Sequence, residues 1–243
     1  MRKVLLAVVV IVALRAHAEE TMTITVTCDG PPCTNEAPRT QWDFALCLDY
    51  ELDTALIEAA ERGDRSAVEL LQRRHASAVS WNERARIGGA LLGKVADDSA
   101  IWKELETHAE SYVRFSEKDE TTRAKLEAFC KEHGYEDPDA YSLAAWDSFA
   151  AASRDRRARP LLLRAVESGE RDVVSNGIIS LAAQHDESAL LAIEAAIRRS
   201  DSPVDLASLL VFYESEAVDR LALQFITDEY GRERYFAQRR QEP

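Results

Sequence analysis

Few residues of this sequence stand at spacings that catalysis or metal binding requires. Cys130 and His133 lie three positions apart on one expected helix, which is half of a zinc site without a matching second half. Glu58 and Glu61 form one of several carboxylate pairs that could act as acid and base. The chain lacks His-Glu-x-x-His, Gly-x-Ser-x-Gly and a Gly-rich phosphate loop. The sequence therefore predicts no catalytic residue, no metal and no cofactor, and favours a protein that is not an enzyme.

Aromatic side chains are the remaining candidates for a binding site, because Trp and Tyr are frequent at the energetically dominant positions of protein interfaces. Trp102 follows Ile101 and precedes charged residues, so it is expected at the edge of an apolar helix stripe. Tyr112 and Tyr141 are expected in similar positions. We predict that Trp102, Tyr112 and Tyr141 contact a partner, while most of the tryptophans fill the core.

The four cysteines are predicted to form two disulfides, because an even number in an exported chain indicates paired thiols. The favoured pairing joins Cys28 to Cys33 across a Gly-Pro-Pro turn and Cys47 to Cys130. The alternative joins Cys33 to Cys47 and Cys28 to Cys130, and the sequence does not decide between them.

The export prediction rests on the first 18 residues. Arg2 and Lys3 precede an unbroken apolar run over 4–14, and Ala16-His17-Ala18 supplies a small-x-small cleavage site. This order is typical of a secretory signal peptide, and the apolar run is too short to span a bilayer. We predict cleavage between Ala18 and Glu19. Because arginine far outnumbers lysine, as in GC-rich bacterial genomes, the predicted location is periplasmic or secreted. No integral membrane span is expected after cleavage.

The charge of the chain limits its partners. The formal net charge is −13, and loss of the three basic residues Arg2, Lys3 and Arg15 on cleavage would make it −16. Nucleic acid requires a basic surface, so it is not an expected partner. A protein or peptide partner is compatible with this charge.

Two kinds of structure are expected in the mature chain. Residues 19–39 form an extended segment, because polar and β-branched residues alternate over 21–27 before the predicted disulfide loop. Residues 40–243 form one all-α domain of about eleven helices, since apolar residues recur at helical spacing and Gly and Pro stand at segment ends. Gly134, Gly169 and Gly231 are predicted to end helices.

The helical region carries a weak internal repeat. Residues 83–105 and 171–193 each contain a helix with an internal glycine, an acidic turn and a second helix that begins Ser-Ala. Helix pairs of this size resemble degenerate HEAT-type repeats of an α-solenoid over residues 80–228. The resemblance implies antiparallel helix pairs that stack and offer a curved surface to another protein, and it supplies no catalytic residues. The alternative is a compact irregular helical bundle.

Three functions follow from these observations. The leading hypothesis is an exported scaffold or adaptor that binds a protein or peptide in an unknown process. One alternative is an envelope hydrolase that uses carboxylate chemistry, and the other is a structural component that self-associates through the strand at 21–27.

Overall fold

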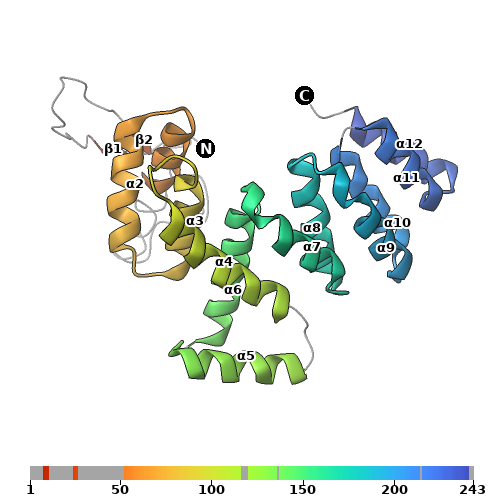
Figure 1. The fold of residues 1–243 in the computed structure, drawn as a ribbon. Coiled ribbons are helices and arrows are strands. Elements are labelled where there is room, and N and C mark those ends of the chain that lie inside the picture. Colours follow the sequence, from red (N-terminus) through yellow and green to blue (C-terminus); the bar gives the residue numbers. More distant parts are fainter. Residues whose placement is uncertain are drawn as a thin grey trace, which may run out of the picture. The chain divides into compact units, whose positions relative to one another are not determined.

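A computed structural model describes residues 8–10, 24–26, 52–115, 120–135, 137–213 and 215–240. The chain divides into two compact units, residues 1–98 and residues 99–243 (Figure 1). The region predicted as one helical domain, 40–243, therefore contributes to both units. Two short strands, β1 Val8–Val10 and β2 Ile24–Val26, pair antiparallel with Val8 opposite Val26. β2 falls within the alternating segment at 21–27, and its partner lies in the apolar run of the predicted signal peptide.

The first unit is built from three helices in its described part. A helix covers residues 52–61, followed by α2 (Arg65–Ser77) and α3 (Trp81–Leu91), which pack on each other. Their shared core contains the fully buried side chains of Leu56, Leu71, Ile87 and Leu91. The turn before α2 is fixed locally, because Gly63 has φ +91° and the Asp64 carboxylate accepts hydrogen bonds from two backbone N–H groups of α2.

The second unit is helical throughout the residues that the structure describes. Its α-helices are α4 (Ser99–Arg114), α5 (Glu120–His133), α6 (Pro138–Ala152), α7 (Arg159–Glu167), α8 (Arg171–Ala183), α9 (Leu190–Arg199), α10 (Pro203–Ser208), α11 (Glu216–Phe225) and α12 (Glu229–Arg239). Three 3₁₀ turns lie between them: η1 (Arg156–Ala158), η2 (Glu187–Ala189) and η3 (Leu209–Tyr213).

These helices pack in pairs, as the sequence predicted. α7 packs on α8, and α10 packs on α11, whereas α4 makes its most extensive contact with α6 and so skips α5. The α7–α8 contact is close because Gly177 faces Val166 and Ala165, where an added Cβ would lie 3.0 and 3.2 Å from their side-chain atoms. An all-α architecture of paired helices is therefore established, and its pairing order is not strictly sequential.

Two of the three predicted helix-ending glycines in this unit are confirmed. Gly134 and Gly169 have positive φ, of +75° and +85°, directly after α5 and shortly after α7. The prediction for Gly231 was wrong, because it lies in the first turn of α12 and donates its N–H to the Asp228 carboxylate at 2.7 Å. One long C-terminal helix was expected, and the chain instead forms α11 and α12, which the Asp228 cap separates.

The structure tests the disulfide prediction at one cysteine only, Cys130. Cys130 is a free cysteine, 1 % exposed, packed with Leu126, Tyr141 and Ala145, so the predicted bond to this thiol is not formed. Its thiol packs instead among apolar and aromatic side chains, and burial raises the pKa of the thiol. Cys28, Cys33 and Cys47, and the cleavage site at Ala18 and Glu19, lie outside the described residues. No described helix combines the length and apolar character that crossing a bilayer requires.

Candidate functional site

The second unit contains a cavity of about 710 Å³ between α4, α5, α6 and the start of α8. Side chains from all four helices line it, and they combine aromatic, aliphatic, polar and acidic groups. The lining residues that the following argument uses are Ser111, Tyr112, Phe115, Arg123, Asp139, Tyr141, Leu143, Trp146, Glu170, Asp172 and Asn176. Around the cavity, α4 makes its most extensive contact with α6, and α5 also contacts α6.

Tyr141 forms the floor of the cavity and packs against aromatic rings that lie outside the lining. Tyr141 is 2 % exposed and donates its hydroxyl hydrogen to Ser111 Oγ at 2.9 Å, which ties α6 to α4. The Tyr141 ring lies 4.3 Å from the Tyr135 ring and 5.7 Å from the Phe129 ring, measured between centroids. Burial raises the pKa of Tyr141 to about 12, so its phenol stays protonated at neutral pH. These contacts favour a single arrangement of the floor.

The turn at the end of α5 places the Tyr135 ring against the Tyr141 ring. With Gly134 in the left-handed conformation, the Tyr135 N–H donates to the Cys130 carbonyl at 2.8 Å, which is a Schellman motif. The chain turns at this point, and the Tyr135 side chain packs against the Cys130 cluster. The left-handed conformation of Gly134 therefore ends α5 and places Tyr135 in the aromatic cluster.

Tyr112 links α4 to α8 at the cavity. Asn176 Nδ2 donates to the Tyr112 hydroxyl oxygen at 2.9 Å, and the Tyr112 ring lies 5.0 Å from that of Phe149. Burial raises the pKa of Tyr112, and the negative charge of Asp172 raises it further, against the Asn176 hydrogen bond that lowers it. The phenol is therefore neutral, and the field of Asp172 reaches this part of the lining.

The rim of the cavity exposes two large apolar side chains on α6. Leu143 is 53 % exposed and Trp146 is 45 % exposed. They stand three residues apart, so they are neighbours on one helix face. The described residues include other exposed apolar side chains, such as Leu191, but Leu143 and Trp146 are the pair that borders a cavity of this size. Such a pair beside a pocket is typical of an interaction site.

The charged groups of the lining are mainly acidic. Asp139, Glu170 and Asp172 contribute three carboxylates and Arg123 contributes one guanidinium. Arg123 Nε lies 3.1 Å from Glu127 Oε1, and Arg123 Nη2 lies 3.5 Å from Asp139 Oδ1. Glu170 and Asp172 stand at the start of α8, where the helix dipole favours acidic side chains.

The three aromatics predicted to bind a partner have different positions. Tyr112 and Tyr141 line the cavity, Tyr112 half-buried and Tyr141 in the floor. Trp102 is outside the lining, and the Arg157 guanidinium covers its ring at 4.7 Å. Sequence reasoning missed Leu143 and Trp146 as rim residues. The signal was present, because Tyr141, Ala145 and Phe149 mark the buried face of α6 and the two rim residues fall beside it.

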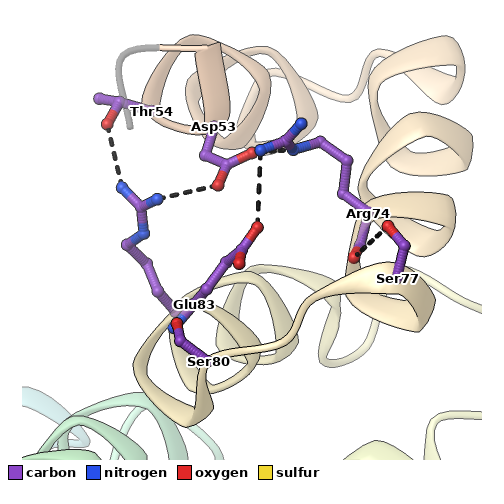
Figure 2. Close-up of polar contacts among 7 residues, drawn as sticks. Asp53, Thr54, Arg74, Ser77, Ser80 and Glu83 are labelled. Atoms are coloured by element: carbon purple, nitrogen blue, oxygen red, sulfur yellow. Dashed lines mark hydrogen bonds and ion pairs between the residues drawn. The ribbon is translucent and has the colours of Figure 1, made fainter. Parts of the chain in front are cut away.

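A second polar cluster lies in the first unit and is of a different kind. Asp53 is 1 % exposed and pairs with Arg74 Nε through one oxygen and with Arg86 Nη2 through the other, at 2.9 Å (Figure 2). Arg74 Nη2 also lies 3.5 Å from Glu83 Oε1, and Ser80 caps α3 by accepting the Glu83 N–H. The cluster joins all three helices of the described unit, and its groups bond to one another.

The residues first considered for catalysis or metal binding are not assembled into such a site. Glu58 is exposed and lies 3.8 Å from Arg62, and the Asp98 carboxylate caps a turn by accepting the Gly93 N–H. Among the described residues no three His, Cys, Asp or Glu side chains are grouped closely enough to hold a metal ion. The His133 ring stacks on Phe129 with centroids 4.1 Å apart.

Comparison with known proteins gives no relative. No family model matches the chain, and neither a curated protein nor a solved structure resembles it at a significant level.

Proposed function

We propose that this chain is a binding protein that holds a segment of another protein in the cavity between α4, α5, α6 and α8. One observation carries the proposal: a cavity of about 710 Å³, lined by Tyr112 and Tyr141, is bordered by the exposed side chains of Leu143 and Trp146. An apolar side chain of a partner would cover these two residues and remove their surface from water, which is favourable in proportion to the buried apolar area.

The proposal extends to the architecture and the location of the protein. The pairs α7–α8 and α10–α11 support a degenerate HEAT-type arrangement of the second unit, in which stacked helix pairs present a shared surface. The basic, apolar and small-residue order of residues 1–18 supports export to the periplasm or the medium. Cell fractionation of a C-terminally tagged chain, with the mature N-terminus sequenced, tests the export proposal; a cytoplasmic chain that retains Met1 would overturn it.

The binding proposal is tested with two matched double variants. Leu143→Ala/Trp146→Ala removes the rim, and Leu191→Ala/Val204→Ala removes two exposed apolar side chains elsewhere in the second unit. Proteins captured by the wild type are quantified by mass spectrometry, and each captured protein is purified and titrated calorimetrically against all three chains. We expect a partner whose affinity falls at least tenfold for the rim variant and is unchanged for the control. Equal binding by all three chains would overturn the proposal.

The envelope hydrolase is a second candidate, and one observation favours it. Asp139, Glu170 and Asp172 line the same cavity. Hydrolysis by acid–base catalysis requires at least two carboxylates, and this lining supplies them. The test is release of soluble fragments from purified envelope polymer by the wild type, with Asp139→Asn and Asp172→Asn as variants. Release that both variants abolish would support hydrolysis, and no release by the wild type would remove it.

A further inference from the structure

The chemistry of the cavity rim narrows the class of partner. The lining carries three carboxylates and one guanidinium, a formal excess of two negative charges, within a chain whose net charge is −13. The single lining arginine, Arg123, already lies within 4 Å of two carboxylates, from Glu127 and Asp139. An anionic ligand would therefore meet repulsion at this cavity, and a cationic ligand would meet attraction.

The acidic charge is concentrated on the α8 side. Glu170 is half-buried and Asp172 is exposed, two positions apart at the start of α8. Asp172 acts electrostatically on Tyr112, whose pKa it raises in addition to the effect of burial. The charge of Asp172 therefore acts on one aromatic residue of the lining.

Besides the carboxylates, an aromatic ring face of the lining also attracts a cation. Trp attracts a cation over its ring face more strongly than the other aromatic side chains, and Trp146 is 45 % exposed at this rim. The chain itself uses this interaction repeatedly: Arg157 covers Trp102 at 4.7 Å and Arg114 covers Phe115 at 5.0 Å. Arg114 already lies over Phe115, and Tyr112 packs on Phe149, so Trp146 is the most exposed aromatic ring of the lining.

From this combination we propose that the bound segment carries a lysine or arginine side chain next to its apolar anchor, and that Glu170, Asp172 and Trp146 select it. This inference rests on the proposed function, since it names the chemistry of the partner at the same cavity. The apolar anchor covers Leu143, while the cationic side chain lies between the Trp146 ring and the carboxylates of α8.

The test uses three immobilised random nonapeptide sets that differ only in the central residue: lysine, norleucine or glutamate. Norleucine keeps the aliphatic chain of lysine and lacks its charge. We expect the wild type to bind the lysine set about five-fold better than the norleucine set at low salt, and the glutamate set least. The preference for lysine should shrink at 0.5 M salt, because exposed charge pairs are screened.

Three variants separate the parts of the proposal. Glu170→Gln/Asp172→Asn should bind the lysine and norleucine sets equally, while the control Glu194→Gln/Glu229→Gln, with the same change of net charge, keeps the wild-type preference. Trp146→Ala should weaken binding of both sets. If the wild type shows no preference for lysine while Trp146→Ala still weakens binding, the charge inference fails and the binding function stands. If no set binds, or if Trp146→Ala binds like the wild type, both fail.

Discussion

The two units use charge in opposite ways. In the first unit the Asp53 carboxylate is 1 % exposed, and both of its oxygens contact guanidinium groups, from Arg74 and Arg86 (Figure 2). At the cavity of the second unit the carboxylates of Asp139 and Asp172 are exposed, beside aromatic and aliphatic side chains that are also partly exposed. The carboxylate of the first arrangement is buried, whereas those of the second, with the apolar side chains beside them, are exposed to solvent.

This difference separates stability from binding. Asp53 is buried and its guanidinium partners are only partly exposed, so removal of the carboxylate leaves two poorly solvated positive charges with less compensation. Exposed carboxylates contribute little to the fold, since water already solvates them, and a half-exposed Trp contributes less than a fully buried one. Substitutions in the first unit should therefore change the free energy of unfolding, and substitutions at the cavity rim should change binding.

The largest expected effect is that of Asp53→Ala. The variant leaves the Arg74 and Arg86 guanidinium groups, which are 24 % and 28 % exposed, without their shared carboxylate. We expect the free energy of unfolding of the first unit to fall by about 3 kcal/mol. Urea denaturation followed by circular dichroism measures it. Glu58→Ala, which removes an exposed pair with Arg62, is the control and should cost less than about 0.5 kcal/mol. Equal losses in both variants would mean that the buried Asp53 cluster stabilises the first unit no more than an exposed ion pair does.

Alkaline pH should destabilise the second unit. Burial raises the pKa of Tyr141 to about 12, and burial also raises the pKa of Tyr213 and Tyr235. A raised pKa means that the folded state holds the phenol proton more tightly. The stability from this preference is therefore fully present below the unfolded value near 10 and is lost as the pH rises towards the folded value. Residues 52–98, which hold the described helices of the first unit, contain no tyrosine and so lack this source of alkaline sensitivity.

For Tyr141 alone the expected loss between pH 9 and pH 11 is about 1.4 kcal/mol. Urea denaturation by circular dichroism across this range measures it. Tyr141→Phe should lower stability at pH 7, because the hydrogen bond to Ser111 is lost, and should flatten the pH dependence. Tyr230→Phe, which removes a phenol from a residue that is 75 % exposed, should keep the wild-type slope. An identical slope in the wild type and Tyr141→Phe would contradict the expectation.

Substitutions at helix ends should destabilise the two units to the same extent, so they serve as a control for the comparison. Gly63 in the first unit and Gly134 in the second have φ of +91° and +75° and end their helices with the same backbone hydrogen-bond pattern. Replacement of either by Ala should cost about 1 kcal/mol, because a Cβ disfavours the left-handed conformation. Asn, which tolerates this conformation better, should cost less at both sites. Thermal denaturation of the four variants measures this, and a large loss at one site alone would reveal contacts beyond the helix end.

The same glycines show how far the sequence predicts this fold. A glycine after an apolar helical segment follows a local rule, and Gly134 and Gly169 obeyed it. Gly231 did not, because its N–H donates to the Asp228 carboxylate, which caps the start of α12. The helix pairing depends on tertiary packing, so the contact of α4 with α6 across α5 was not predictable from neighbouring segments. The free thiol of Cys130 likewise reflects its packing, which cysteine counting does not report.

The candidate site was predictable only in part for the same reason. Tyr112 and Tyr141 were selected by residue type and do line the cavity, while Trp102 was selected by the same reasoning and lies under Arg157. Residue type indicates what a side chain can bind, and only packing decides whether the chain has already covered it. The Asp53 cluster gave no sequence signal, since Arg74 and Arg86 lie 21 and 33 residues away from it.

The last variant, Trp146→Ala, is the most informative about the rim. Because the side chain is 45 % exposed, its removal should lower the free energy of unfolding by about 2 kcal/mol, less than truncation of a fully buried Trp. Its neighbour Ala145, which is 2 % exposed on the buried face of α6, is the control: Ala145→Leu should overpack the cavity floor and cost about 1–3 kcal/mol. Urea denaturation at pH 7 measures both. A loss of about 3–5 kcal/mol for Trp146→Ala would mean that the Trp146 ring belongs to the core, and the rim would then lack the surface that the proposed partner covers.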